Sequence, residues 1–190
     1  MASIQLDNVT KYFGNFRAVD EVSLTIADGE FMVFVGPSGC GKTTSLNMIA
    51  GFEDPTSGVV RISNVDVTDR EPGERDLGMV FQSLALFPHM TVKDNIEFGL
   101  LIKKVPAAEV ATRVQAVVET LKIEPLITQR PGQLSGGEAQ RVALARTIVN
   151  NPSAFLMDEP LSSLDAKLRV EMRTELKRLH TSLKSTFVYV

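Results

Sequence analysis

The sequence predicts an α/β fold with a mainly parallel sheet, an N-terminal antiparallel β subdomain and a helical subdomain. Short apolar runs at residues 31–35, 77–81 and 154–157 indicate buried strands, and helical patterns separate them along the chain. Near the N-terminus, hydrophobic and polar residues alternate, as is typical of half-buried antiparallel strands. From about residue 83 to about residue 150 the pattern is mainly helical. Together these observations favour a sheet with helices between its strands.

The length and composition are those of an ordinary globular chain. Its 190 residues, 44% of them hydrophobic, can bury a core, and we expect one domain over residues 1–190. The net charge of −3 gives no indication of nucleic-acid binding. Cys40 is the single cysteine, which excludes an internal disulfide and fits a reducing compartment. Because no apolar run approaches the roughly 20 residues of a membrane span, and the N-terminus lacks a signal-peptide core, we expect a cytoplasmic protein.

The N-terminal residues have the pattern of two paired strands. Hydrophobic residues alternate with polar ones in two stretches: Ile4, Leu6 and Val9, and then Val22, Leu24 and Ile26. Gly14 and Asn15 lie between these stretches, which favours a turn that joins antiparallel strands. Phe13 directly precedes this turn, and its local sequence alone favours packing of the ring in the core.

A glycine-rich loop follows the apolar run at residues 31–35. Its members are Gly36, Pro37, Ser38, Gly39, Cys40, Gly41, Lys42 and Thr43, with Thr44 directly after them. The spacing G-x-x-x-x-G-K-[ST], after a strand and before a helix, is that of the Walker A phosphate loop. Glycines let the backbone turn tightly and direct its N–H groups inward, and the helix N-terminus adds a favourable dipole. The sequence therefore predicts a P-loop nucleotide site.

Three side chains of this loop carry specific chemistry. We expect Lys42 to reach the β- and γ-phosphates of a bound triphosphate, and the Thr43 hydroxyl to ligate Mg²⁺. A nucleoside triphosphate and Mg²⁺ are thus the predicted ligands of this loop. The Cys40 thiol lies where a bound nucleotide would cover it, and an inert filler of the loop is the alternative interpretation of this residue.

Polar residues directly follow two of the predicted strands. Gln82 comes after residues 77–81, and Asp158 and Glu159 come after residues 154–157. Ligands bind at the carboxyl ends of the strands in open α/β sheets, so these positions suit ligand chemistry. Asp158 can hold Mg²⁺ with its water shell, and Glu159 can accept a proton from the attacking water. For Gln82 taken alone, a solvated loop residue is an equally good interpretation.

Helix signals fill the chain between these motifs. Thr91 with Asp94, and Ser135 with Glu138, are capping-box pairs that begin two helices. The capped N-terminus after Ser135 also suits an anion, because two glycines follow it. Pro106 begins another helix, whose apolar face carries Val110, Val114, Val117, Val118 and Leu121.

A long amphipathic helix precedes the last predicted strand. Its apolar face carries Leu164, Leu168, Met172, Leu176, Leu179 and Leu183. The charges between Lys167 and Arg178 have both signs interspersed, which indicates a solvated face and not a nucleic-acid patch. Residues 186–190 are apolar and rich in β-formers, and we expect them to form a strand inside the parallel sheet.

Together these motifs resemble those of the ATP-binding cassette (ABC) ATPases, in the same order and over essentially the whole chain. The corresponding features are residues 36–43 for Walker A, Gln82 for the Q-loop, residues 134–138 for the LSGGQ signature, Asp158 and Glu159 for Walker B with the catalytic glutamate, and Leu164 with Asp165 for the D-loop. Phe13 lies where the family stacks an aromatic ring on adenine, so the resemblance replaces core packing as the expectation for this residue. The resemblance implies an ABC-type P-loop NTPase fold.

The resemblance also implies roles for individual residues. It implies catalytic roles for Glu159, Lys42 and Gln82. It also implies that Thr43, Gln82 and Asp158 coordinate magnesium. Nucleotide contacts fall to Phe13, Gly36, Pro37, Ser38, Gly39, Cys40, Gly41, Lys42, Thr43, Thr44, Ser135, Gly136, Gly137 and Asp165. Since the family pairs two ATPase subunits head to tail across two ATP molecules, the signature of one copy faces the Walker motifs of the other.

Within the family, residues 80–92 and 158–169 resemble ATPase subunits of binding-protein-dependent importers, and the sugar (maltose-type) branch is the most similar. This implies a peripheral protein on the cytoplasmic face of the cell membrane. Transmembrane permease subunits would dock in the groove beside Gln82, and a solute-binding protein would act through them. The expected solute is a carbohydrate, with polyamine, phosphorylated-polyol and anion importers as alternatives.

Two departures from the family pattern bear on activity. The signature ends in Glu138 instead of glutamine, which either strengthens the helix cap or repels a γ-phosphate nearby. The switch-loop histidine of the family follows the strand at 186–190, and neither His89 nor His180 takes its place. We therefore expect a C-terminally incomplete nucleotide-binding domain, with a helical subdomain at about 83–150, that binds ATP and hydrolyses it slowly. A transport ATPase is the first hypothesis, and a binding module that holds ATP but turns it over poorly, because the switch histidine is absent, is the second. A DNA-repair or ribosome-acting ABC ATPase is the third, and the chain lacks the insertions or tandem cassettes of those groups.

Overall fold

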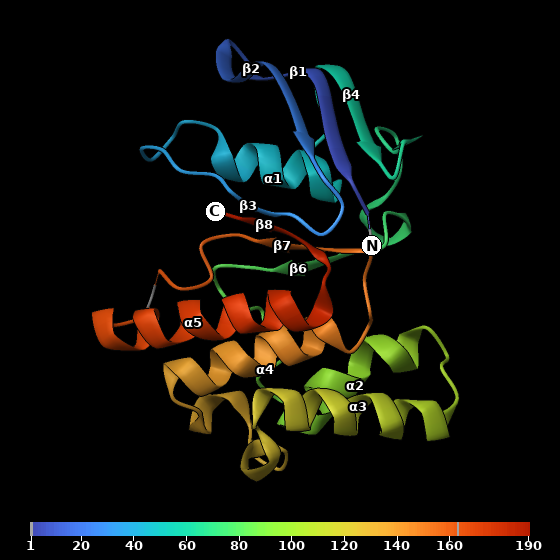
Figure 1. Ribbon diagram of the computed structural model, residues 1–190, viewed down its shortest axis with the longest axis vertical. Coiled ribbons are helices and arrows are strands. Elements are labelled where there is room, and N and C mark those ends of the chain that lie inside the picture. Colours follow the sequence, from blue (N-terminus) through green and yellow to red (C-terminus); the bar gives the residue numbers. More distant parts are fainter. Residues whose placement is uncertain (1, 163) are drawn as a thin grey trace. The chain divides into compact units, whose positions relative to one another are not determined.

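The computed structural model describes residues 2–162 and 164–190, which form two compact units (Figure 1). The first unit contains Met1–Met79, Ser153–Asp158 and Lys177–Val190, and the second contains Val80–Pro152 and Glu159–Leu176. The two units are described one after the other. Within the described residues, no helix combines the length and the apolar character that crossing a lipid bilayer requires.

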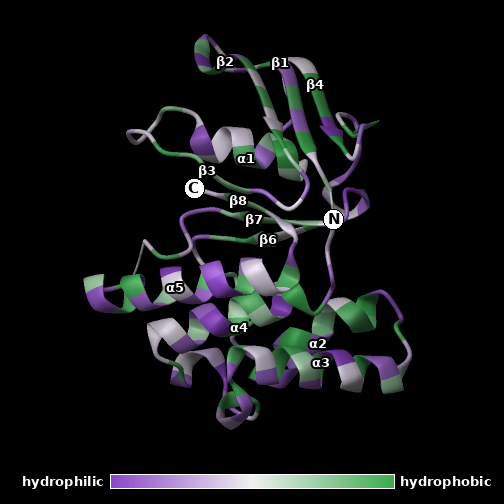
Figure 2. Cartoon of the chain, viewed as in Figure 1, coloured by the Kyte–Doolittle hydropathy of each residue, from purple (hydrophilic) through white to green (hydrophobic). Residues whose placement is uncertain are grey.

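An antiparallel sheet forms part of the first unit. It contains β1 (Ile4–Phe13), β2 (Phe16–Ile26), β4 (Ser57–Ile62) and β5 (Val65–Asp66), in the order β2-β1-β4-β5. The apolar residues that were predicted to alternate lie opposite one another in pairs: Ile4 with Ile26, Leu6 with Leu24, and Val9 with Val22. Hydrophobic and hydrophilic residues alternate along these strands (Figure 2), and the buried ones join the hydrophobic core of the first unit. The predicted antiparallel strands are therefore confirmed.

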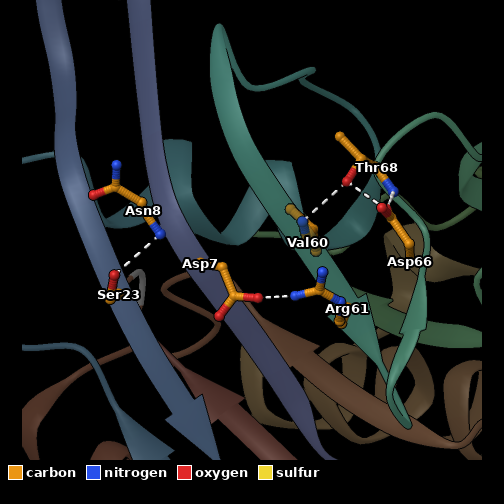
Figure 3. Close-up of polar contacts among 7 residues, drawn as sticks. All are labelled: Asp7, Asn8, Ser23, Val60, Arg61, Asp66 and Thr68. Carbon is orange, nitrogen blue, oxygen red and sulfur yellow. Dashed lines mark hydrogen bonds and ion pairs between the residues drawn. The ribbon is translucent and has the colours of Figure 1, made fainter.

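A bulge in β1 is held by a side chain of the neighbouring strand. The pairing register of β1 with β2 shifts around Asn8, whose φ is 51°. Asparagine enters the left-handed region more readily than most residues do. The Asn8 N–H donates to the Ser23 hydroxyl at 3.0 Å (Figure 3), and an ion pair between Asp7 and Arg61 links the same strand to β4. Polar side chains of the neighbouring strands thus hold β1 in place where its pairing with β2 is irregular.

The parallel sheet has the order β3-β8-β7-β6. Its strands are β3 (Phe31–Val33), β6 (Leu77–Val80), β7 (Ala154–Met157) and β8 (Thr186–Tyr189). β8 pairs in parallel with both β3 and β7, so the strand expected at residues 186–190 is confirmed and lies in the interior of the sheet. All four residues of β7 are buried. With this sheet, the antiparallel sheet and the helices described below, the predicted α/β fold class is confirmed.

One predicted strand is shorter than expected. The apolar run at residues 31–35 is a strand only over Phe31–Val33, and the Val35 side chain is 88% exposed. β3 lies at the edge of the sheet, and its ladder with β8 extends by one further bond, from the Phe34 N–H to the Tyr189 carbonyl. After this bond the backbone leaves the sheet and enters the glycine-rich loop. Val35 therefore lies outside the strand, although it is hydrophobic.

A buried arginine fixes the C-terminal end of α1 (Lys42–Ala50). The helix ends at Gly51, whose φ of 85° is the left-handed conformation typical of a glycine that caps a helix. Arg75 is only 2% exposed, and its guanidinium donates to the carbonyls of Met48 and Ile49 in the last turn of the helix. It also donates to two carbonyls of the loop that leads to β6. Burial lowers the pKa of Arg75 from its ordinary value, and the carbonyl contacts stabilise the buried charge.

Replacing Arg75 with methionine should lower the free energy of unfolding by roughly 2–4 kcal/mol, because several carbonyls would lose a charged donor. Urea unfolding followed by circular dichroism measures this change. Arg17→Met is the matched control, because the Arg17–Asp20 ion pair is half-exposed and its loss should cost less than about 0.5 kcal/mol. An Arg75→Met protein as stable as the parent would show that these contacts do not hold the helix in place.

The second unit is mainly helical. It contains α2 (Val92–Ile102), α3 (Ala107–Leu121), α4 (Gly136–Ile148) and the larger part of α5 (Ala166–Leu183), with short 3₁₀ turns at Glu124–Leu126 and Pro131–Gln133. The predicted cap of α2 is confirmed, since Thr91 and Asp94 form a complete capping box. The predicted apolar face of α3 is buried at all five positions: Val110, Val114, Val117, Val118 and Leu121. The boundaries at about 83–150 that we expect for a helical subdomain stay a prediction.

Candidate functional site

The glycine-rich loop between β3 and α1 has a conformation that depends on its glycines. Gly39 and Gly41 have φ angles of 80° and 88°, in the left-handed region that other residues rarely adopt. A Cβ atom at Gly41 would lie 2.4 Å from the Ala18 carbonyl oxygen. Position 41 therefore requires glycine both for its backbone angle and for lack of space.

Lys42 reaches back across this loop. Its ammonium donates hydrogen bonds to the carbonyls of Gly36 at 3.0 Å and Pro37 at 2.7 Å, and it lies 3.6 Å from the Cys40 sulfur. The exposed members of the loop are Gly36, Pro37, Ser38, Gly39 and Cys40. The loop thus surrounds a positive charge and faces solvent, as a site for a polyanion requires.

Thr43 and Asp158 meet, although 115 positions separate them in the sequence. The Thr43 hydroxyl donates to a carboxylate oxygen of Asp158 at 2.9 Å. Thr43 lies in the first turn of α1, and Asp158 directly follows β7. Hydroxyl and carboxylate oxygens are ligand types that Mg²⁺ prefers. In donor type and in proximity, the two residues fit a magnesium site.

Phe13 lies at the end of β1, beside the hairpin turn, and its side chain is 45% exposed. The core packing that its local sequence favours is therefore wrong, because the hairpin extends beyond the residues that form the core. The Lys11 ammonium lies 5.0 Å from the centroid of the Phe13 ring, and it pairs with Glu53 at 3.0 Å. The exposed part of the ring is accessible to a stacking ligand.

In the second unit, Gln82 and Glu159 come together around Ser162. The Gln82 amide donates to a Glu159 carboxylate oxygen at 3.5 Å and to the Ser162 hydroxyl at 3.3 Å. The Ser162 hydroxyl donates in turn to the Glu159 backbone carbonyl at 2.9 Å. The structure therefore brings two of the predicted catalytic side chains together. Ser162 was missed by the sequence analysis, although its place three residues after Glu159, where a turn would close, was the available signal.

The capping box predicted at the start of α4 is confirmed. The Glu138 N–H donates to the Ser135 hydroxyl, and the Glu138 carboxylate accepts from the Ser135 hydroxyl at 2.6 Å and from its N–H at 2.8 Å. These hydrogen bonds lower the pKa of Glu138, so its carboxylate is charged at neutral pH. Glu138 therefore takes part in the cap of α4, which agrees with the first of the two effects expected from glutamate at this position.

Three predicted nucleotide contacts of the second unit also have structural roles. A Cβ atom at Gly136 would lie 3.1 Å from the Leu164 side chain, and one at Gly137 would lie 3.0 Å from Leu168. These glycines therefore let the start of α4 pack closely on neighbouring leucines. The Asp165 carboxylate accepts a hydrogen bond from the Leu168 N–H at 3.0 Å, as a cap of α5 does.

Arg146 in α4 holds the loop that follows Gln82, and the sequence analysis missed this residue too. Leu84 and Ala85 are consecutive residues with φ angles of 58° and 49°. Such angles strain the backbone of any residue other than glycine. The Arg146 guanidinium donates to both of their carbonyls and lies 5.6 Å from the Phe87 ring. Burial lowers the pKa of Arg146. The half-buried guanidinium thus stabilises the strained turn, and this loop is fixed to α4.

Comparison with known proteins decides the family. The sequence matches the ABC transporter family over residues 19–162. The chain belongs to the ABC transporter family. The post-hydrolysis dimer of the ATP-binding cassette MJ0796, which is bound to ADP and Pi, resembles it with a TM-score of 0.84 and 36% sequence identity. The likeness covers 98% of this ABC chain and 87% of the MJ0796 chain.

Two curated relatives match this ABC chain along its whole length. The sn-glycerol-3-phosphate import ATP-binding protein UgpC of Brucella abortus (strain 2308) is 56% identical over 191 residues. The trehalose/maltose import ATP-binding protein MalK of Thermococcus litoralis is 55% identical over 196 residues. The matched regions are 54% and 53% of those proteins, so this chain spans about half the length of the curated relatives.

In this ABC chain, alkylation of Cys40 should block ATP binding, and prior binding of Mg-ATP should protect the thiol. The thiol is exposed in the phosphate loop and lies close to Lys42, where an added group would occupy the space of the phosphates. Maleimide labelling, followed by mass spectrometry, should slow by about tenfold or more at saturating Mg-ATP. In a Lys42→Ala protein the nucleotide should give no protection. Equal labelling of the parent protein with and without Mg-ATP would support an inert loop filler.

Proposed function

We propose that this chain is the ATP-binding and ATP-hydrolysing subunit of an ABC importer, which energises uptake of a small solute. The observation that carries the proposal is the contact of Thr43 with Asp158, which joins the phosphate loop to the carboxylate at the end of β7. A hydroxyl and a carboxylate beside a lysine-bearing loop are the parts with which P-loop ATPases bind a magnesium–triphosphate substrate. Membership of the ABC transporter family supports the same function.

ATP would be held by the phosphate loop and by the hairpin. The backbone N–H groups of residues 38–44 would donate to the phosphates, and the Lys42 ammonium would exchange its carbonyl contacts for the β- and γ-phosphate oxygens. The exposed ring of Phe13 would stack on adenine. Thr43, Asp158 and Gln82 would hold Mg²⁺, which when bound neutralises phosphate charge.

Hydrolysis would depend on the cluster in the second unit. Glu159 would accept the proton of the attacking water, since its carboxylate follows a strand end where ligands bind. The Gln82 amide nitrogen is engaged with Glu159 and Ser162, which leaves the two lone pairs of its carbonyl oxygen for Mg²⁺ and for the attacking water. Ser135, Gly136, Gly137 and Asp165 would act on the nucleotide of a second copy, paired head to tail. The dimeric state of MJ0796 supports such a pair.

Import requires further partners. Transmembrane permease subunits would receive the chain in the groove beside Gln82, at the cytoplasmic face of the membrane, and a solute-binding protein would deliver the solute. One relative is named for trehalose and maltose import, and another for import of sn-glycerol-3-phosphate. We propose a carbohydrate as the solute here, with a phosphorylated polyol as the alternative.

Uptake by cells that lack this chain tests the proposal. Uptake of labelled trehalose, sn-glycerol-3-phosphate and spermidine is measured in the deletion strain, and again with the parent chain or Glu159→Gln supplied. We expect carbohydrate uptake to be lost in the deletion strain and restored only by the parent chain. Restoration by Glu159→Gln at the parent rate would overturn the role of hydrolysis, and loss of spermidine uptake alone would overturn the proposed solute class.

A further inference from the structure

The Arg169 side chain donates hydrogen bonds to backbone carbonyls just before α5. Its guanidinium donates to the carbonyls of Leu161 at 3.3 Å, Ser162 at 3.4 Å and Leu164 at 2.8 Å. Arginine has five N–H donors in a rigid planar fork, so one side chain can hold several carbonyls in a fixed arrangement. Because Arg169 is itself part of α5, these three carbonyls are fixed to that helix.

The same segment closes a turn that begins at Glu159. Both the N–H and the hydroxyl of Ser162 donate to the Glu159 carbonyl, at 3.1 Å and 2.9 Å. The φ of Glu159 is 43°, and a residue with a side chain keeps such an angle only when its surroundings enforce it. The bonds from Ser162 are the contacts that enforce it from the C-terminal side, and Arg169 holds the Ser162 carbonyl.

The Ser162 hydroxyl is also the point where Gln82 meets this turn. The Gln82 amide lies 3.3 Å from that hydroxyl and 3.5 Å from the Glu159 carboxylate. A displacement of Ser162 would therefore shift the Glu159 backbone and the Gln82 amide together. The distance between the proton acceptor and the water that it activates depends on both groups.

We propose that Arg169 is a positioning residue for ATP hydrolysis, which acts through Ser162 on the Glu159 carboxylate and the Gln82 amide. This inference rests on the proposed function, because it takes Glu159 as the proton acceptor. Arg169 itself is not expected to touch ATP. Its loss should therefore lower turnover and leave nucleotide affinity unchanged.

The test compares Arg169→Met, Arg169→Lys and Ser162→Ala with the parent chain, in ATP turnover and in the Kd for Mg-ATP. We expect Arg169→Met and Ser162→Ala to lower kcat by roughly 10- to 100-fold, with Kd within about twofold. Arg169→Lys should recover part of the loss, because an ammonium still donates to some of the carbonyls. Arg173→Met is the matched control, since this exposed arginine lies one turn further along α5 and should leave kcat unchanged.

Combination with Glu159→Gln separates a positioning role from a general loss of structure. If Arg169 acts through Glu159, Arg169→Met should reduce the residual turnover of the Glu159→Gln protein by less than about twofold. An equal loss in both backgrounds, or a parent-like kcat for Arg169→Met and Ser162→Ala, would overturn the inference while Glu159→Gln still lost activity. A Glu159→Gln protein with the parent turnover would overturn the proposed function and this inference together.

Discussion

Replacing Lys42 with alanine is expected to abolish measurable binding of Mg-ATP. Lys42 is the only side-chain cation of the loop at residues 36–43, and its ammonium is held there by the carbonyls of Gly36 and Pro37. Two charge-assisted hydrogen bonds to phosphate, at roughly 1.5–3 kcal/mol each, correspond to a loss of about 10²–10⁴-fold in affinity. Titration calorimetry with Mg-ATP measures the Kd directly.

Two further variants test whether the loss of ATP binding is due to the positive charge of Lys42. Lys42→Gln keeps a donor for the carbonyls of the loop but removes the charge, and it should lose ATP binding as well. Lys93→Ala, on the exposed side of α2, is the control and should bind like the parent. Binding within about threefold of the parent for both Lys42 variants would show that the backbone N–H groups suffice to hold the phosphates.

Replacing Glu159 with glutamine is expected to lower ATP turnover by roughly 10²–10⁴-fold and to leave ATP binding intact. Glutamine has the same shape as glutamate but cannot accept the proton of the attacking water. The hydrogen bonds from Ser162 are accepted by the backbone carbonyl of residue 159, which the substitution leaves unchanged. The turn should therefore keep its conformation. Phosphate release measures turnover, and titration calorimetry measures binding.

Glu171→Gln provides the control for Glu159→Gln, because Glu171 is an exposed glutamate of α5. The control should hydrolyse ATP at the parent rate. If Glu159→Gln also hydrolysed ATP at that rate, the base would be another group, and the cluster of Gln82, Glu159 and Ser162 would have a structural role only.

Much of the fold could be predicted because its elements carry local signals. The capping boxes at Thr91 and Ser135 need only two residues three positions apart, and both form as predicted. The paired strands at the N-terminus follow from alternation of hydrophobic residues, and α3 follows from its helical spacing. The phosphate loop could be placed in the same way, since its spacing is local and Gly39 and Gly41 meet a requirement of the backbone.

The rest could not be predicted, because it depends on contacts between distant segments. Three arginines, Arg75, Arg146 and Arg169, donate to backbone carbonyls, and a carbonyl has no signature in the sequence. The left-handed turn at Leu84 and Ala85 could not be predicted from the sequence either, because neither residue prefers that conformation. The strand expected at residues 31–35 ended early for a related reason, since hydrophobicity does not reveal where the chain must turn towards a loop.

The interior position of β8 also sets an order of assembly. In the described sheet β3 has β8 as its neighbour, and β7 lies between β8 and β6, so Phe31 cannot pair with Phe187 until residue 187 has been synthesised. The hairpin of β1 and β2 needs only its own local turn, and it can form while the ribosome is still extending the chain. Until β8 arrives, the apolar strands β3 and β7 have unpaired edges, which is when association with other chains competes most strongly with folding. A chaperone that covers these edges should therefore raise the yield of folded protein more than any change to the hairpin.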